Sequence, residues 1–190
     1  MWTLSLCRMK RPLLVLVPAL LVGCGKEAVP TEEVARVPKG RIVVNELQAT
    51  ASAVLNEFGE AADWFEIHNP GPAITLKAGE WFVSDNTDSE LREFELPEIT
   101  VPEGGFIVIW CDEEKGGREI HASFKLSTDA GSIAIIHAEP KGLKIIDEAP
   151  IDASPGSEVS YGRAVDGAAA WGRLSPPTPG APNDGAPEMP

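Results

Sequence analysis

The fold of this chain is decided by the segment Asp63-Trp64-Phe65-Glu66-Ile67-His68-Asn69-Pro70-Gly71. Phe65 and Ile67 are two positions apart, so in an extended strand they lie on the same face, with Glu66 on the other. Pro70 has no backbone N–H to donate to a neighbouring strand, and the Asn-Pro-Gly sequence favours a turn. The segment therefore predicts a β-strand that has one apolar face and ends at a turn.

Short strands of this kind, separated by turn residues, are predicted along most of the chain. A spacing of about 8–12 residues, with Gly, Pro, Asn and Asp between the strands, is typical of an all-β sandwich or barrel. Residues 51–62 lack the pattern, and we expect a long loop there. We predict an all-β sandwich, with strands at residues 41–47, 64–69, 73–77, 81–84, 91–96, 105–111, 122–126, 132–137, 143–148, 159–163 and 170–173.

Residues 106–111, Phe-Ile-Val-Ile-Trp-Cys, form the most continuous apolar run among these segments. Such a run is typical of a strand that is buried on both faces. We therefore expect a central strand, with Ile107 and Ile109 on one side and Val108 and Trp110 on the other.

The amino terminus has the features of a secretion signal. Three basic residues precede an apolar stretch of about 10 residues, Leu13 to Val22, which lies within the roughly 7–15 residues of a signal peptide. A membrane-spanning helix needs about 20 residues. The pattern favours secretion, with the basic residues supplied by Arg8, Lys10 and Arg11.

The residues that follow, Leu21-Val22-Gly23-Cys24-Gly25, resemble the lipobox of bacterial lipoproteins. The resemblance implies that the Cys24 thiol receives fatty acyl chains, palmitate among them, and that residues 1–23 are removed. It also implies a lipid-anchored protein of the bacterial cell envelope, with residues 24–40 as a flexible tether. Enteric lipoproteins kept at the inner membrane carry Asp after the cysteine, so Gly25 favours the outer membrane.

Removal of residues 1–23 would leave 167 residues (190 − 23) with 13 Lys+Arg against 29 Asp+Glu, a net charge of −16. This length suits one domain, which we place at residues 41–183, with a disordered tail at 184–190. A strongly acidic surface repels phosphate backbones and anionic headgroups. The charge excludes nucleic acid as a partner, and contact with a membrane must come from the lipid on Cys24.

The cysteines leave no pair for an intramolecular disulfide, because Cys7 departs with the signal and Cys24 is acylated. We expect Cys111 to be a buried, inert thiol. A nucleophilic or cross-linking role is the alternative.

Seven further segments resemble the lamin tail domain, an immunoglobulin-like sandwich of nuclear lamins and many secreted bacterial proteins. This resemblance implies the fold and no particular function. The chain departs from the family in the inserted Glu80, in His68 where Tyr is commoner, and in Val165 where Pro is usual. The matching segments are residues 42–47, 63–70, 79–85, 101–105, 121–126, 160–171 and 178–183.

Within these segments Arg163 is the one permanent cation that we expect to be structural. Its planar guanidinium could clamp Glu66 or Glu46 across the sheet. Asp166-Gly167 supplies the positive φ that a tight turn needs.

The histidines do not form a recognisable metal motif. His68, His121 and His137 are at least 16 positions apart, and no His-x-x-x-His or Cys-x-x-Cys spacing occurs. The acidic segment 85–90 lacks the glycine and glutamate spacing of an EF-hand, so we expect an acidic hairpin loop. Calcium binding by Asp85, Asp88 and Glu90 stays open.

No catalytic constellation is evident, since the chain has no Gly-x-Ser-x-Gly elbow and no phosphate-binding glycine loop. We predict no catalytic residues, no cofactor and no metal. The expected function is that of an interaction or structural module, which presents loops of a rigid sandwich to a protein or glycan. The alternative is a metal-dependent envelope hydrolase that uses His121 or His68 with acids as ligands.

Overall fold

A computed structural model describes residues 42–50, 53–114, 116–127, 131–152 and 156–183 of the chain, and these residues form strands, turns and loops without a helix. None of these described residues forms a helix long and apolar enough to cross a membrane. The predicted signal peptide, lipobox with Cys24, tether and tail lie outside the described residues. The strands are β1 (Val43–Gln48), β2 (Asp63–His68), β3 (Ile74–Leu76), β4 (Trp81–Ser84), β5 (Phe94–Glu95), β6 (Ile99–Val101), β7 (Phe106–Cys111), β8 (Ile120–Ala122), β9 (Ser132–Glu139), β10 (Gly142–Pro150), β11 (Ser160–Arg163) and β12 (Trp171–Leu174).

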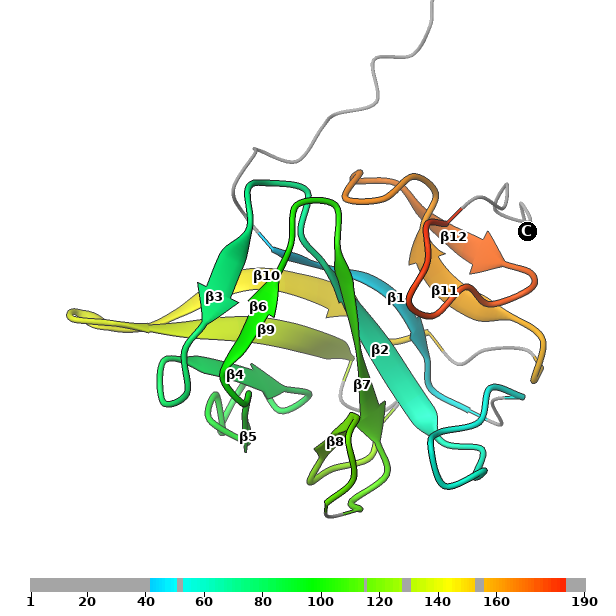
Figure 1. Ribbon diagram of the computed structural model, residues 1–190, viewed down its shortest axis with the longest axis horizontal. Helices are drawn as coiled ribbons and strands as arrows, with labels where there is room; N and C mark the ends of the chain where they lie inside the picture. Colours follow the sequence, from blue (N-terminus) through cyan, green and yellow to red (C-terminus); the bar gives the residue numbers. More distant parts are fainter. Residues whose placement is uncertain (1–41, 51–52, 115, 128–130, 153–155, 184–190) are drawn as a thin grey trace, which may run out of the picture. The chain divides into compact units, whose positions relative to one another are not determined.

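The strands form three sheets (Figure 1). The largest has the order β12-β11-β1-β2-β7-β8, the second β10-β9-β4-β5, and β3 pairs with β6. Phe65 and Ile67 of β2 share one apolar core with Val83 of β4 and with Ile133 and Ile135 of β9. Because this core joins side chains of the two larger sheets, the protein is a β-sandwich, and the all-β prediction is confirmed.

A bulge in β1 positions the polar residues discussed below. The pairing of β1 with β2 shifts register between Val44 and Glu46. As a result Val44 and Leu47 both face the core although they are three residues apart. Asn45 and Glu46, between them, lie outside the apolar core yet are fully buried. The bulge therefore places two adjacent polar side chains on the outer face of the large sheet.

Three strand predictions differ from the structure. The strand expected at residues 122–126 is instead β8, at 120–122; Phe124 and Leu126 are buried in the core but join no ladder. The strand expected at 91–96 is reduced to the two residues of β5. Strand β6 was not predicted, because it is only three residues long and lies between two turns. The loop expected at 51–62 is a loop over its described part, closed by a bridge between Leu55 and Ala61.

Strand β7 is buried less evenly than its sequence suggests. Ile109 and Cys111 lie in the core, whereas Val108 on the other face is only half-buried. The reason is that β8 pairs only with residues 109–111 of β7, which leaves the first half of β7 at the sheet edge. The expectation of two fully buried faces is therefore wrong for Val108. Cys111 is buried as predicted, and burial raises the pKa of its thiol.

Candidate functional site

Two buried carboxyl groups face each other on the outer side of the large sheet. Glu46 of β1 pairs in register with Glu66 of β2, and neither side chain is exposed. The carboxylate of Glu46 accepts hydrogen bonds from Ser160 Oγ, from Thr178 N at 2.9 Å and from Thr178 Oγ1 at 2.8 Å. Glu66 accepts from Gly180 N at 2.6 Å and from Asn45 Nδ2 at 3.0 Å.

Burial raises the pKa of both carboxyl groups. For Glu66 the pKa rises to about 8, and the negative charges of Glu46 and Asp166 add to the effect of burial. Burial also raises the pKa of Glu46, against the hydrogen bonds from Ser160 and Thr178, which lower it. Glu66 therefore holds its proton at neutral pH, and only one negative charge of the pair has to be accommodated.

These hydrogen bonds hold the last described segment, residues 178–183, on the sheet. Asn183 donates from its backbone N to Asp166 Oδ1 at 3.0 Å and from Nδ2 to the Arg163 carbonyl at 2.8 Å. Asn45 Nδ2 also donates to Asp166 at 3.0 Å. Both buried glutamates thus accept hydrogen bonds from groups of the protein itself. Their role is therefore structural.

Arg163 does not clamp Glu46 or Glu66 as predicted. Its Nη2 lies 2.8 Å from Asp147 Oδ2, its Nε donates to the Val44 carbonyl at 2.7 Å, and its guanidinium stacks over Trp171 at 4.9 Å. Asp147 belongs to β10 of the second sheet, so the ion pair joins the two sheets. The two glutamates are already satisfied by neutral donors, which removes their need for a cation.

Of the histidines, two have structural surroundings. His68 is buried and stacks on Phe106, with ring centroids 4.5 Å apart, and burial lowers its pKa. His137 stacks on Trp81 at 4.3 Å. His121 is different, because it lies beside a cleft and among carboxylates.

The acidic segment 85–90 does not gather its carboxylates. Asp85 points inward and accepts a hydrogen bond from Ser127 N at 3.0 Å, while Asp88 and Glu90 are exposed. Among the described residues, no group of three potential metal ligands includes them. The structure shows a turn closed by Asn86, whose side chain accepts a bond from Ser89 Oγ at 2.8 Å.

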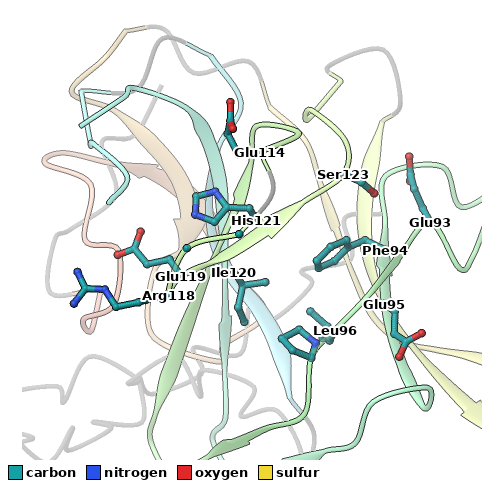
Figure 2. A pocket seen from close by; sticks show the side chains of 13 residues that line it. Glu93, Phe94, Glu95, Leu96, Glu114, Arg118, Glu119, Ile120, His121 and Ser123 are labelled. Atoms are coloured by element: carbon teal, nitrogen blue, oxygen red, sulfur yellow. The ribbon is translucent and has the colours of Figure 1, made fainter. Parts of the chain in front are cut away.

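A cleft of about 730 Å³ opens between residues 93–97, which include β5, and the β7–β8 loop with β8. Figure 2 shows Ile120 on one side and Phe94 and Leu96 opposite it, so that the cleft has apolar walls. Its described lining residues also include four acidic side chains and one arginine: Glu93, Glu95, Glu114, Glu119 and Arg118.

His121, at one end of the cleft, is surrounded by carboxylates from separate parts of the chain. Its side chain is only 2% exposed. The Nδ1 atom lies 2.9 and 3.1 Å from the two oxygens of Asp112, and Nε2 lies 3.6 Å from Glu57 Oε1. Glu119 completes the group, and Figure 2 shows its carboxylate next to the imidazole ring.

The sequence identified His121 as a possible ligand but did not identify Glu57, Asp112 or Glu119. These residues come from the loop before β2 and from the two ends of the β7–β8 loop, so no fixed spacing connects them. Comparison with family models, with curated proteins and with solved structures found no match for this chain.

Proposed function

We propose that this chain is a lipid-anchored module of the bacterial cell envelope, which presents a lamin-tail-like β-sandwich to a protein partner and has no catalytic turnover. The lipobox supports attachment through Cys24, at the outer membrane, since Gly25 follows the cysteine. Support for the lamin-tail type comes from the segments that carry the resemblance. Asn45, Glu46, Glu66 and residues 178–183 belong to those segments and meet in one hydrogen-bond network.

The main support for a binding function is the cleft lined by residues 93–97 and by the β7–β8 loop. Apolar walls offer an area that a partner side chain can cover, and the acidic residues at its edge attract positive charge. The net charge of the chain, −13, gives the same preference over a longer range. We propose that the partner is a protein whose contact surface combines an apolar side chain with Lys or Arg.

A charge-reversal experiment tests this proposal. The full chain serves as bait in detergent-solubilised envelope, and Glu95→Lys with Glu114→Lys reverses two charges of the cleft. The matched control reverses two exposed acids elsewhere, Glu103→Lys with Glu158→Lys. We expect the cleft variant alone to lose the partner. Equal capture by both variants would contradict the proposal, and a partner that survives protease digestion would be a glycan.

The second candidate, a metal-dependent envelope hydrolase, is favoured by the position of His121 beside the cleft. It predicts turnover in esterase, phosphatase, nuclease or glycosidase assays that requires a divalent metal and disappears in His121→Ala. If these assays show no turnover with or without metal, the binding function is retained.

A further inference from the structure

His121 has a buried nitrogen without a hydrogen-bond partner. Its Nε2 atom accepts and donates no hydrogen bond in the described structure, although the side chain is 98% buried. The contact with Glu57 Oε1, at 3.6 Å, is too long for a hydrogen bond. A buried polar atom of this kind requires an explanation, and a bound ion is one of the established ones.

Asp112 determines which nitrogen is available. A carboxylate only accepts hydrogen bonds, so Nδ1, at 2.9 Å from Asp112 Oδ2, is the nitrogen that donates to Asp112. The nitrogen left to bind a metal through its lone pair is Nε2, which lies 3.6 Å from Glu57 Oε1. A histidine that donates one ring N–H to a carboxylate and offers the other nitrogen is the usual arrangement of a metal ligand.

Two carboxylates lie within reach of that lone pair. One ligand atom from each of Glu57, Glu119 and His121 can be chosen so that all three lie within 4.8 Å of one another. In a tetrahedral site with bonds of about 2.0–2.1 Å, ligand atoms are about 3.4 Å apart. His121 Nε2 and Glu57 Oε1 are 3.6 Å apart, which brings the Glu57 carboxylate within reach of a metal bound to Nε2.

The two glutamates hold each other in place. Glu57 Oε1 accepts hydrogen bonds from the backbone of Glu119 at 2.8 Å and of Arg118 at 2.5 Å, and Glu119 Oε2 accepts from the backbone of Glu57 at 3.1 Å. Trp110 Nε1 also donates to Glu119 Oε2, at 2.7 Å. Backbone bonds that link the two loops fix the ligands before any ion arrives.

Among the described residues, the cation beside these ligands is Arg118, and it is weakly attached. Arg118 Nε lies 3.5 Å from Glu57 Oε2, and the Arg118 side chain is 93% exposed. The guanidinium can therefore move into solvent when another cation enters.

We propose that His121 Nε2, Glu57 and Glu119 form a site for a divalent first-row transition metal, with Zn²⁺ as the best match. One imidazole and two carboxylates suit Zn²⁺ better than Ca²⁺ or Mg²⁺, which take oxygen ligands. His121 and Glu119 also line the cleft, so the remaining coordination positions face it. This proposal goes beyond the protein-binding function, and it holds whether or not the cleft has a protein partner.

The test measures metal binding by the full chain, purified in detergent and freed of metal. Zn²⁺ is titrated against a chromogenic chelator, and Co²⁺ serves as the spectroscopic probe. We expect one Zn²⁺ per chain, a higher melting temperature, and a Co²⁺ spectrum without the charge-transfer band of a thiolate. A thiolate band would place the metal on a cysteine and overturn the proposal.

Variants locate the site. His121→Gln and Glu119→Gln should each weaken Zn²⁺ binding at least about tenfold. The controls are His137→Gln, which removes a histidine elsewhere, and Glu114→Gln, which removes another acid of the same cleft; both should bind as the wild type does. Glu119 is exposed, so its variant remains informative if His121→Gln fails to fold. Unchanged affinity in Glu119→Gln, or no binding by the wild type, would contradict the site.

Discussion

Replacement of Glu66 by Gln should change how the stability of the protein depends on pH. The unfolded carboxyl group has its ordinary pKa of 4.5, and in the folded protein the pKa is about 8. Between these values the folded protein binds a proton that the unfolded chain has released. Its contribution to stability is therefore complete below pH 4.5 and is lost as the pH rises toward and through about 8.

The size of the loss follows from the pKa. Each pH unit within the window corresponds to about 1.4 kcal/mol, and the dependence flattens as the pH approaches the pKa. Between pH 6.5 and pH 8, Glu66 alone should lower the free energy of unfolding by about 1.5 kcal/mol. This window avoids two other groups. It lies above the pKa of about 6 of folded Asp63 and above the pKa of 6.5 of unfolded His68. The pKa of His68 is lowered in the folded protein, so titration of His68 would raise the stability with pH instead of lowering it.

The assay is urea denaturation of the purified chain at several pH values from 6.5 to 8, followed by tryptophan fluorescence. Glu66→Gln should be less stable by about 1–3 kcal/mol, because its amide cannot accept from both Gly180 N and Asn45 Nδ2. Its stability should nevertheless fall by about 1.5 kcal/mol less than that of the wild type across the window. Glu103→Gln, an exposed change, serves as the control. Parallel curves for wild type and Glu66→Gln would show that Glu66 does not hold a proton in the folded protein at these pH values.

Three other predictions follow from the sandwich and the anchor. Ile109→Ala should cost about 2–5 kcal/mol of stability and Val108→Ala less than about 1, because only Ile109 fills the core; equal unfolding midpoints would show that the two faces are alike. Arg163→Lys should lose about 1–3 kcal/mol in the same denaturation assay, since an ammonium cannot contact Asp147, the Val44 carbonyl and Trp171 together. Cys24→Ser should abolish fatty-acid labelling and leave uncleaved precursor. Normal labelling of that variant would show that Cys24 does not carry the lipid anchor.

The sequence predicted the fold well where one pattern determines the structure. In β2, the alternation of Phe65 and Ile67 with polar residues is sufficient to place one face in the core. In β1, the bulge after Val44 breaks the alternation, so the joint outward placement of Asn45 and Glu46 could not be derived from a period of two. The same limit applies to Val108, whose exposure depends on the short length of the neighbouring strand β8.

The candidate sites were harder to predict, because their members meet only in the folded chain. Glu57 and Glu119 are 62 positions apart and exchange backbone hydrogen bonds through their carboxylates. Arg163 was predicted to pair within its own sheet, but Asp147 reaches it from β10 of the other sheet, next to a shift in the pairing of β10 with β9. Such contacts depend on how two sheets are packed, which a single sequence pattern does not encode.

Photo-cross-linking in intact cells can show whether the cleft binds a protein partner, as proposed above. A photoreactive residue replaces Glu95 at the cleft or, as control, the exposed Glu103 in the turn before β7. We expect one protein adduct of discrete mass from position 95, weakened when Glu114→Lys is added, and none from position 103. No adduct from position 95, or the same adduct from both positions, would show that the cleft does not bind a protein partner.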